Sequence, residues 1–548
     1  MTKQTILSIF CAVFFIVNNG LFAQEEKAYW ISLSDKNHNE YSLHNASTFL
    51  SPAALERRQR QNISLNETDL PISPSYKQQI LATGAREHAV SKWFNAITVW
   101  ADDAAIAQIT QLPFVKSVKC ISRHAQRSNL QTKKLAISTE TLDDDFFGDS
   151  FNQLKMMQGD LLQLNGFRGE NMLIAIMDAG YVGLENSEAL AKVRNNNQIV
   201  FTYDYVHHSS EISSANSSHG YNVFCLLAGS IPDKYSGSAP NAQYALFVTE
   251  DVSSETPIEE SNWLAAAEKA DSLGADVLST SLGYSVFDAG WDSYTYEDMN
   301  GETTIITRAA DMAAAKGMLV INSAGNEGND AWKYITAPAD GDSVLTVGAV
   351  NPEGIYAGFS SQGPTFDGRI KPNIMAQGAS SVLITPLSDI VTGSGTSYAT
   401  PILAGLAACL WQSAPETNNM DIFTTIETTA SQALNPDYFM GYGIPNFAKA
   451  YEKLHEKTLF THEENDPRTH IFYQEQNYEI VLYSDVAQKV HLDLYNSTGQ
   501  LLASFNIQTN DNQVYELAQY LPSGLNAGVY FYQIKGDNFS ETQKIVQF

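Results

Sequence analysis

Cysteine is scarce in this sequence, with four residues in a chain of 548. One of them, Cys11, lies in an apolar run close to the N-terminus, so the rest of the chain holds only Cys120, Cys225 and Cys409. So few thiols exclude a disulfide framework as the main source of stability. Cys225 and Cys409 lie in apolar helical patterns, and we expect both to be buried and unreactive.

Positive charge is also in short supply. The chain has 33 Lys and Arg residues against 61 Asp and Glu residues, and its formal net charge is −28. A surface of this sign repels phosphate groups, so nucleic acid is excluded as a partner. With 44% hydrophobic and 17% charged residues, the composition is that of a globular protein, which excludes wholesale disorder.

No stretch after the first residues stays apolar for the length of a membrane span. The N-terminal sequence has Lys3, an apolar run over 6–17 and the small residue Ala23, which predicts a signal peptide at 1–23. The run is too short to cross a bilayer comfortably, so we expect no transmembrane anchor. A retained membrane anchor and lipoprotein processing at Cys11 are the alternatives to this interpretation.

A chain of this length exceeds a single core and should divide into domains. Residues 24–146 begin as a small α+β module and end in a polar linker. Over 147–455, short apolar runs alternate with helical patterns, which predicts an α/β domain whose parallel sheet carries helices on both faces. A charged linker at 456–469 leads to 470–548, where period-two alternation between Gly and Asn turns predicts a small β-sandwich.

Several element boundaries in the N-terminal module follow from local signals. The runs "KAYWISL", "WFNAITVWA" and "FVKSVKCI" are typical of strands. Ser51 before Pro52 predicts the start of one helix, and Asp102 with Asp103 predicts the start of another. A third helix, "YKQQILATGA", is expected to stop at Gly84.

Three residues with reactive or ionisable side chains stand at element boundaries of the α/β domain. Asp178 ends the apolar strand "MLIAIMD", His219 begins the helical pattern "HGYNVFCLLAG", and Ser397 lies between a glycine-rich turn and an apolar helix in "GSGTSYATPILAG". Each has a structural interpretation of its own, as a helix cap or a packed histidine. Together they supply what nucleophilic serine chemistry needs, namely a hydroxyl, a base and a carboxylate that orients the base.

The chain order Asp, His, Ser is that of subtilisin. The segments "IAIMDAGY", "SSHGYNVFCLLAG", "LVINSAGNEG" and "GSGTSYATPILAG" resemble the four signature blocks of the subtilisin-like serine proteases, the subtilases of peptidase family S8. An α/β-hydrolase esterase is disfavoured, because Ser397 is not in a Gly-x-Ser-x-Gly segment and the order of the three residues differs.

The resemblance implies a catalytic role for four residues. Ser397 would attack the scissile carbonyl, His219 would act as general base and then general acid, and Asp178 would hold the imidazole. Asn326, in "SAGNEG", would donate to the oxyanion together with the Ser397 backbone N–H. Taken alone, Asn326 in a glycine-flanked loop would be interpreted as a turn former.

The resemblance also implies two edges that bind polypeptide substrates as an added strand. Ordinary strand ends are the alternative for both. The residues of the two edges are Ser281, Leu282, Gly283, Ser323, Ala324 and Gly325. After His219 the sequence departs from the family pattern at Tyr221 and Asn222, which predicts a bulkier helix face toward the substrate groove.

Hydrolysis of this kind requires no cofactor and no catalytic metal. The insert at 285–304 carries acidic and amide oxygens, and calcium could be held there as a structural ion, as in many relatives. The insert has no EF-hand-like spacing, and solvated loop carboxylates are the alternative.

The flanking regions resemble known accessory domains. Within 24–146, "ILATGA", "FNAITVWA" and "ITQLPFVKSV" resemble an inhibitor-type subtilase propeptide, so the chain's own propeptide is an expected partner, with maturation within 127–146. It would template a slowly folding parallel sheet and block premature proteolysis. Residues 470–548 resemble the sorting domain of type IX secretion, which implies the secretion machinery as a partner and a secreted or cell-surface location. A generic adhesive sandwich is the alternative.

The sequence therefore predicts a secreted serine endopeptidase that works through an acyl-enzyme with an Asp-His-Ser triad. The alternative is a catalytically silent binding or adhesion protein on a subtilase scaffold. The four occupied catalytic positions favour the enzyme.

Overall fold

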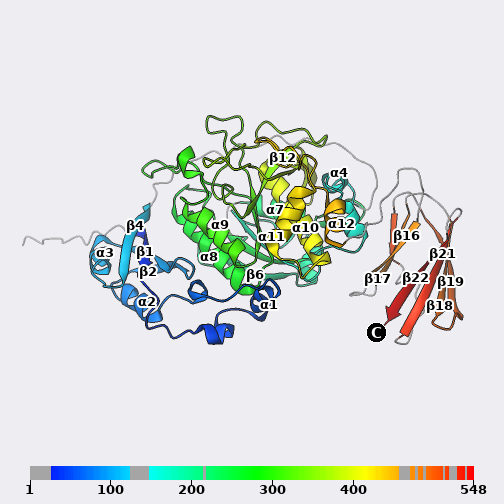
Figure 1. The fold of residues 1–548 in the computed structure, drawn as a ribbon, viewed down its shortest axis with the longest axis horizontal. Coiled ribbons are helices and arrows are strands. Elements are labelled where there is room, and N and C mark those ends of the chain that lie inside the picture. The colour runs from blue at the N-terminus through cyan, green and yellow to red at the C-terminus, as the bar shows by residue number, and fades with distance from the viewer. Residues whose placement is uncertain are drawn as a thin grey trace, which may run out of the picture.

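The computed structural model describes residues 26–123, 147–213, 217–455 and 469–547, the last range with gaps at 475–478, 485–488, 510–512, 517–527 and 537–539. The predicted signal peptide, the linker with its maturation region and nearly all of the second linker lie outside the described residues. Figure 1 shows the described elements in chain order.

The N-terminal module is a four-stranded antiparallel sheet in the order β2-β3-β1-β4. Its strands are β1 (Lys27–Leu33), β2 (Arg86–Ser91), β3 (Ala96–Ala101) and β4 (Val115–Arg123), and its helices are α1 (Pro52–Arg60), α2 (Pro74–Leu81) and α3 (Asp103–Ile109). Short 3-10 helices cover Leu43–Thr48 and Glu67–Asp69. The predicted caps are confirmed, since the Ser51 and Asp102 side chains accept from the N–H groups of Ala54 and Ala105.

The central sheet has seven parallel strands in the order β13-β12-β11-β10-β5-β9-β6. The strands are β5 (Leu173–Asp178), β6 (Ile199–Asp204), β9 (Gln243–Val248), β10 (Val277–Thr280), β11 (Leu319–Ser323), β12 (Val344–Val350) and β13 (Ile374–Gln377). Two small hairpins stand beside it, β7 (Ser230–Ile231) with β8 (Tyr235–Ser236) and β14 (Ser381–Ile384) with β15 (Ile390–Gly393).

Helices cover both faces of this sheet, as the sequence predicts (Figure 1). Ile174 and Ile176 of β5 belong to one hydrophobic cluster, while Ala175 and Met177 belong to another on the opposite face. The first cluster includes α5 (Gly159–Leu164), α7 (His219–Ala228), α10 (Thr396–Ser413), α11 (Asn419–Thr428) and α12 (Phe447–His455), and the second includes α8 (Ile258–Leu273) and α9 (Ile305–Ala315). The remaining helices are α4 (Phe151–Lys155), α6 (Ala191–Asn195) and a 3-10 turn at Tyr296–Asp298.

The N-terminal module shares a hydrophobic core with the helices of the second face. Trp30, Trp93 and Ile121 of the module are buried in the same cluster as Trp263 of α8 and Ala309 of α9. A separate cluster closes the other side of the module's sheet. The module is therefore packed on the α/β domain through a continuous apolar interface.

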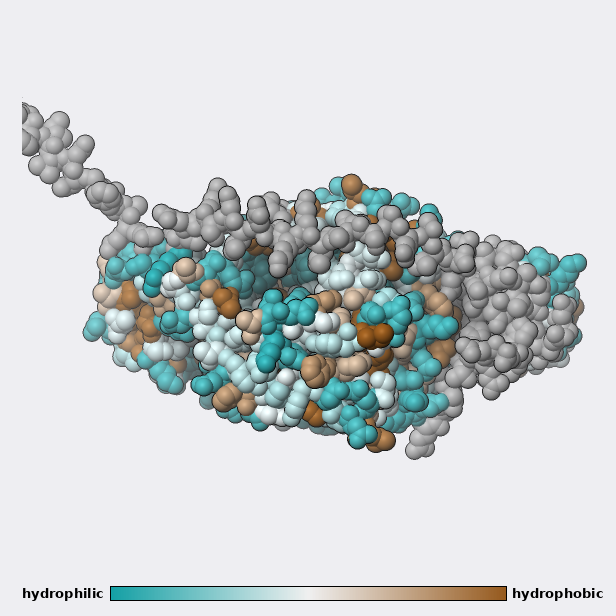
Figure 2. Space-filling view, turned by 90° about the horizontal axis from the view of Figure 1, so that it is seen from above, coloured by the Kyte–Doolittle hydropathy of each residue, from teal (hydrophilic) through white to brown (hydrophobic). Residues whose placement is uncertain are grey.

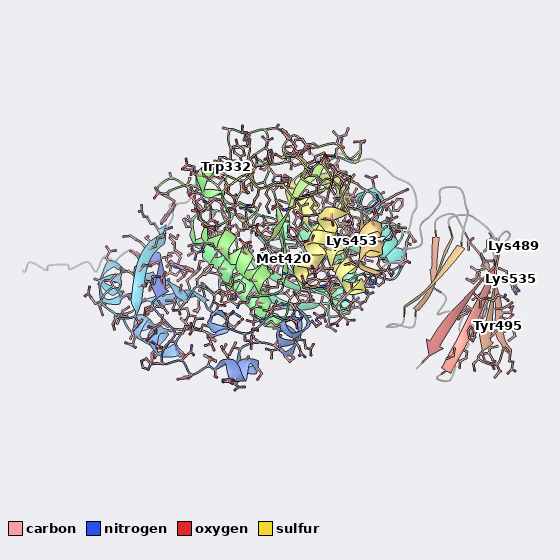
Figure 3. The ribbon with its side chains drawn as sticks, in the orientation of Figure 1. Trp332, Met420, Lys453, Lys489, Tyr495 and Lys535 are labelled. Atoms are coloured by element: carbon pink, nitrogen blue, oxygen red, sulfur yellow. The ribbon has the colours of Figure 1, made fainter. Side chains whose placement is uncertain are left out.

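The C-terminal region consists of two antiparallel sheets, in the orders β16-β17-β20 and β19-β18-β21-β22. Their strands are β16 (Thr469–Gln474), β17 (Glu479–Ser484), β18 (Lys489–Asn496), β19 (Leu501–Gln508), β20 (Gln513–Glu516), β21 (Gly528–Lys535) and β22 (Ser540–Gln547). Alternate residues of β18 and β21 are buried, whereas Lys489 and Lys535 lie at the surface (Figure 3). The predicted fold class is confirmed in all three regions.

The described residues also show how the surface is composed and where the cysteines lie, and Cys225 and Cys409 are buried as expected. On the face seen in Figure 2, hydrophobic residues are scattered among hydrophilic ones in the described part of the chain. Within the described ranges, no helix has the length and hydrophobicity to cross a bilayer. Cys225 and Cys409 are buried in α7 and α10, and burial raises the pKa of the Cys225 thiol to about 12.

Candidate active site

Three elements of the α/β domain bring the predicted catalytic residues to one edge of the sheet. β5 lies inside the sheet between β10 and β9 and ends at Asp178, and the carboxyl ends of parallel strands are where such folds place functional groups. His219 is the first residue of α7, and Ser397 is the second residue of α10. The element boundaries predicted from the sequence for these three residues are therefore confirmed.

Asp178 and His219 form a close pair. The Nδ1 atom of His219 lies 2.8 Å from Oδ1 of Asp178, and this oxygen also accepts from the Ala179 N–H at 2.7 Å. Asp178 is 2% exposed, whereas 34% of the His219 side chain is exposed. A carboxylate can only accept, so the neutral imidazole must carry its proton on Nδ1, which leaves Nε2 as an acceptor on the open side.

A glycine allows this approach. A Cβ atom at Gly220 would lie 2.7 Å from the Gly180 carbonyl oxygen and 3.0 Å from Cβ of Asp178. Both distances are shorter than atoms tolerate without displacement, so the start of α7 can lie against the end of β5 only because residue 220 has no side chain.

The carboxylate also controls the protonation of the imidazole. Burial alone would lower the pKa of His219, but the charge of Asp178 and the hydrogen bond to it outweigh burial and raise this pKa above its ordinary value. The net direction means that the pair favours the imidazolium form more than a free histidine does.

Ser397 is held at the start of α10 without serving as its cap. The N-cap is Gly395, and Oγ of Ser397 donates to the Ser281 carbonyl at 3.3 Å. In return, Oγ of Ser281 donates to the Ser397 carbonyl at 2.9 Å. The simple capping interpretation is therefore wrong for this serine.

The imidazole of His219 lies close to Tyr398, the residue that follows Ser397. No hydrogen bond joins Ser397 to His219 in the part of the chain that the structure describes. The ring of the adjacent Tyr398 lies 5.9 Å from the His219 ring, between centroids, so the imidazole stands beside the first turn of α10.

Asn326 is tied to the same helix start. Its Oδ1 atom accepts from the Thr396 N–H at 2.9 Å and from the Thr396 hydroxyl at 3.1 Å. Because the oxygen is engaged, the amide nitrogen is available to donate elsewhere, and within the described residues it has no partner. The Ser397 N–H belongs to the first turn of α10, where N–H groups lack intrahelical acceptors and the helix end is positive. The Asn326 side chain and the Ser397 N–H therefore both lie at the start of α10.

The two predicted substrate edges differ in how much backbone they leave free. Ala324 donates to Val347 and accepts from Thr336, so this wall is largely occupied by its own neighbours. Gly283 is exposed at the end of β10, and no backbone partner is found for it among the described residues. The Ser281 and Leu282 carbonyls accept from side chains, so at this edge Gly283 is the residue that is open to pair with an extended peptide.

The expectation of a bulkier helix face toward the groove is wrong for Tyr221. Its side chain is fully buried, and its hydroxyl lies 2.6 Å from the Ser187 hydroxyl and donates to the Thr385 carbonyl at 3.0 Å. The side-chain volume of Tyr221 therefore fills the interior beneath the β14–β15 hairpin and does not reach the surface of the groove.

Two residues near the site were missed from the sequence. The hydroxyl of Tyr284, directly after Gly283, donates to Oε2 of Glu250 at 2.5 Å. Burial, with a contribution from the charge of Asp178, raises the pKa of Glu250 to about 7. The available signal was weak, because an acidic residue after an apolar strand is common in solvated loops.

The insert at 285–304 uses some of its acidic oxygens in hydrogen bonds within the protein. Oδ2 of Asp298 accepts from Thr295 in a local turn, and Oδ2 of Asp288 accepts from the Glu255 N–H, which lies outside the insert. Nowhere in the described ranges does a cluster of three or more His, Cys, Asp or Glu residues have the arrangement of a metal site.

Sequence and structure comparisons identify the regions. Residues 169–443 match the subtilase family, 28–136 match the peptidase S8 propeptide domain of Bacteroidota, and 476–547 match the secretion system C-terminal sorting domain. Subtilisin E of Bacillus subtilis (strain 168) is 26% identical over 395 residues, which cover 71% of this chain and 89% of the relative. Serine protease AprX of the same organism is 35% identical over 162 residues, which cover 26% of this chain and 34% of the relative.

A solved structure shows the same fold. The epidermin leader peptide processing serine protease of Staphylococcus aureus aligns with a TM-score of 0.54 at 16% identity, over 79% of this chain and 100% of that chain. The protein is thus homologous to serine proteases with a subtilisin-like fold. It belongs to the subtilase family, and it carries an S8 propeptide domain before the α/β domain and a type IX sorting domain after it.

Proposed function

We propose that the protein is a secreted serine endopeptidase that hydrolyses peptide bonds through an acyl-enzyme. Ser397 attacks the scissile carbonyl, His219 takes the hydroxyl proton and returns it to the leaving amine, and Asp178 holds the imidazole and stabilises its charged form. Asn326 and the Ser397 N–H stabilise the oxyanion. The observation that carries the proposal is the Asp178–His219 pair beside the first turn of α10.

Substrate binding and export complete the proposal. An extended polypeptide pairs with the edge at 281–283 and lies against 323–325, so the main chain of the substrate supplies most of the affinity. The reaction needs no cofactor. The sorting domain supports export by type IX secretion to the medium or the cell surface, without a transmembrane anchor.

A fluorophosphonate probe tests the function directly. The probe reacts with a serine only when a working base and oxyanion site activate it. We expect the protein, once separated from its propeptide, to be labelled on Ser397 and to cleave casein. A folded protein that takes no label would instead support the silent binding or adhesion protein.

Removal of the side-chain oxyanion donor gives a second test. Asn326→Ala should lower kcat by about 10²–10³, the range for such a donor in subtilisin. Asn326→Asp keeps an oxygen for Thr396 but places a negative charge near the oxyanion, so its kcat should fall at least as far. A recovery of kcat in Asn326→Asp would show that the bonds to Thr396, rather than the amide nitrogen, are what the reaction needs.

The pH dependence of kcat/KM gives a third test. Catalysis needs the neutral imidazole, and Asp178 raises the pKa of His219, so activity should be lost as pH falls through a midpoint above the ordinary histidine value of about 6.5. The measurement is a profile of kcat/KM between about pH 5 and 9. His207 is the control, because it is bonded to Asp204 in a similar pair away from the site, and His207→Gln should leave the midpoint unchanged.

A further inference from the structure

Residues 42–69 form an arm that leaves the sheet of the propeptide domain. The arm contains α1 and the two 3-10 helices, and it connects β1 to α2. Its apolar residues Ala46, Leu50 and Ala54 make a cluster of their own, apart from the core of the propeptide sheet. In Figure 1, α1 lies beneath the α/β domain, well away from β1–β4.

The arm covers the C-terminal end of α8. The Ser51 N–H donates to the Ser272 carbonyl at 3.0 Å, and its hydroxyl donates to the Leu273 carbonyl at 2.9 Å. Arg57 donates to the Ala275 carbonyl just beyond the helix. These are carbonyls at or just beyond a helix end, which lack intrahelical partners, so the arm supplies donors that water would otherwise provide.

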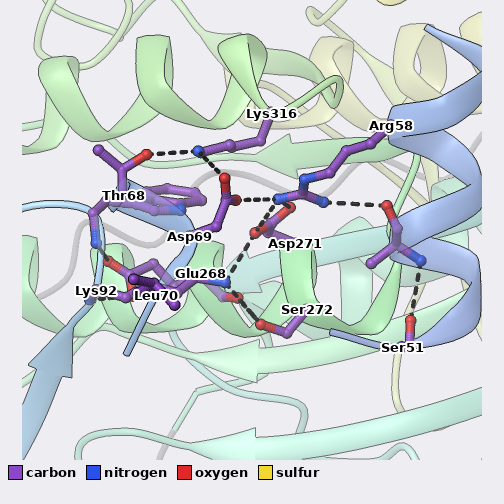
Figure 4. A network of polar contacts seen from close by, with 12 residues as sticks. Ser51, Arg58, Thr68, Asp69, Leu70, Lys92, Glu268, Asp271, Ser272 and Lys316 are labelled. Carbon is purple, nitrogen blue, oxygen red and sulfur yellow. Dashed lines mark hydrogen bonds and ion pairs between the residues drawn. The ribbon is translucent and has the colours of Figure 1, made fainter. Parts of the chain in front are cut away.

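A buried ionic network joins the arm to the α/β domain (Figure 4). Asp271 of α8 is fully buried and bonds Arg57 at 2.6 Å, Arg58 at 2.8 Å and Lys92 at 3.0 Å. Asp69 of the arm bonds Arg58 at 2.9 Å and Lys316 at 3.0 Å. Burial would raise the pKa of Asp271, but the three cations hold it at about 2, so this carboxylate is charged at neutral pH.

The arm also contacts elements further along the domain. Gln61 donates from Nε2 to the Gly317 carbonyl at 2.7 Å, after α9, and accepts from the Asn419 N–H at 3.1 Å, at the start of α11. Arg60 pairs with Asp276 at 3.3 Å. One short segment therefore bridges α8, α9 and α11.

The arm lies far from the catalytic edge. α8 ends at Leu273, just before β10 begins at Val277, so Asp271 stands where the parallel strands begin. The Asp276 carboxylate accepts from the Leu173 N–H, at the first residue of β5, whereas Asp178 is the last residue of that strand. The arm cannot reach the substrate groove, so its contacts serve a purpose other than blocking that groove.

We propose that the surface formed by the ends of α8 and α9 and the start of α11 is a docking site that holds the propeptide through the arm after the linker has been cut. This docking proposal rests on the peptidase proposal in one respect only, namely that self-cleavage would be the reaction that cuts the linker. A propeptide bound at two separate places leaves slowly, because release at one place is followed by rebinding while the other remains attached. Dissociation of the arm from this docking site is then the step that frees the enzyme.

The test uses the full chain with Ser397→Ala and a recognition sequence for an unrelated protease inserted between 123 and 147. After cutting, the dissociation rate of the propeptide is measured by dilution and size-exclusion chromatography. Arg57→Ala with Arg58→Ala leaves Asp271 buried with fewer cations, and we expect release at least about a hundredfold faster. Arg86→Ala is the matched control, because the exposed Arg86 forms its one ion pair among the described residues with Glu26 of the propeptide domain.

A second variant covers the case in which the double substitution impairs folding. Gln61→Ala removes two uncharged bonds and should accelerate release several-fold. The proposal would be overturned if the propeptide left both the Arg57→Ala, Arg58→Ala variant and the Gln61→Ala variant at the rate measured for the Arg86→Ala control. The result does not depend on catalysis, since the Ser397→Ala background is inactive whether or not the peptidase proposal holds. In the active chain, the arm variants should shorten the lag before activity and leave the kcat/KM of the freed enzyme unchanged.

Discussion

Ser397→Ala is expected to lower kcat for casein by about 10⁶-fold, the order of loss that removal of the serine causes in a subtilisin. The change removes only Oγ, whose bond in the resting enzyme is a single donation to the Ser281 carbonyl at 3.3 Å. Such a bond contributes about 1 kcal/mol, so the thermal unfolding transition should move little. The substitution should therefore abolish the reaction while leaving the fold intact.

The measurement pairs casein hydrolysis with circular dichroism on chains separated from their propeptide. Ser394→Ala is the matched control, since Ser394 lies in the same glycine-rich segment and only accepts from the Ser380 N–H. It should remain active and keep the fluorophosphonate label. If Ser397→Ala still cleaves casein at a rate near that of the Ser394→Ala control, another residue is the nucleophile.

Self-processing provides an independent readout of the same substitution. If the enzyme cuts its own linker, the Ser397→Ala chain should keep residues 24–146 attached, and intact mass spectrometry should find a single species. A chain that matures normally despite the substitution would mean that a different protease performs this cut.

The α/β architecture and the site edge could be predicted because both depend on patterns close together in the sequence. Buried parallel strands are continuous apolar runs, and "MLIAIMD" carries its carboxylate at the end of such a run. Asn326 was assigned through a family resemblance instead, because an asparagine between glycines has no distinctive pattern. The contact that positions it, from Thr396, joins a loop to the start of α10 and is visible only in the structure.

The arm shows where pattern-based prediction stops. The Ser51 cap predicted the start of α1 correctly. Arg58 of this helix, however, pairs with Asp271, which is 213 residues away in the sequence. Nothing in either local segment indicates that pairing, since basic residues on a helix are usually solvated. β2 was missed for a related reason, because "REHAVS" begins with exposed polar residues and gains its order from β3 and from α8.

The two ends of the sheet then have separate tasks. We propose that hydrolysis takes place at the carboxyl ends of β5 and β11. The propeptide, by our second proposal, is retained where β5 and β10 begin. Substitutions in one region should therefore leave the other unaffected, because no residue belongs to both. This separation makes the release and turnover experiments independent of each other.

Asp178→Asn is expected to lower kcat by about 10⁴-fold, as the equivalent change does in a serine protease triad. The carboxylate accepts from Nδ1 of His219 and so keeps Nε2 free to take the serine proton. An amide can donate to Nδ1, which stabilises the wrong tautomer. Oδ2 of Asp178 has no partner within the described residues, so the bonds that act on the new amide are those at the Oδ1 position, to the Ala179 N–H and to His219.

The same substitution should also change the pH profile. Asp178 raises the pKa of His219, so its loss should move the acid midpoint of the residual activity to lower pH. Asp204→Asn is the matched control, because Asp204 accepts from Nδ1 of His207 in the same manner but outside the site. It should retain both kcat and the midpoint. A fall in kcat without any displacement of the midpoint would mean that Asp178 acts by supporting the end of β5 and the start of α7, and that its charge does not act on the imidazole.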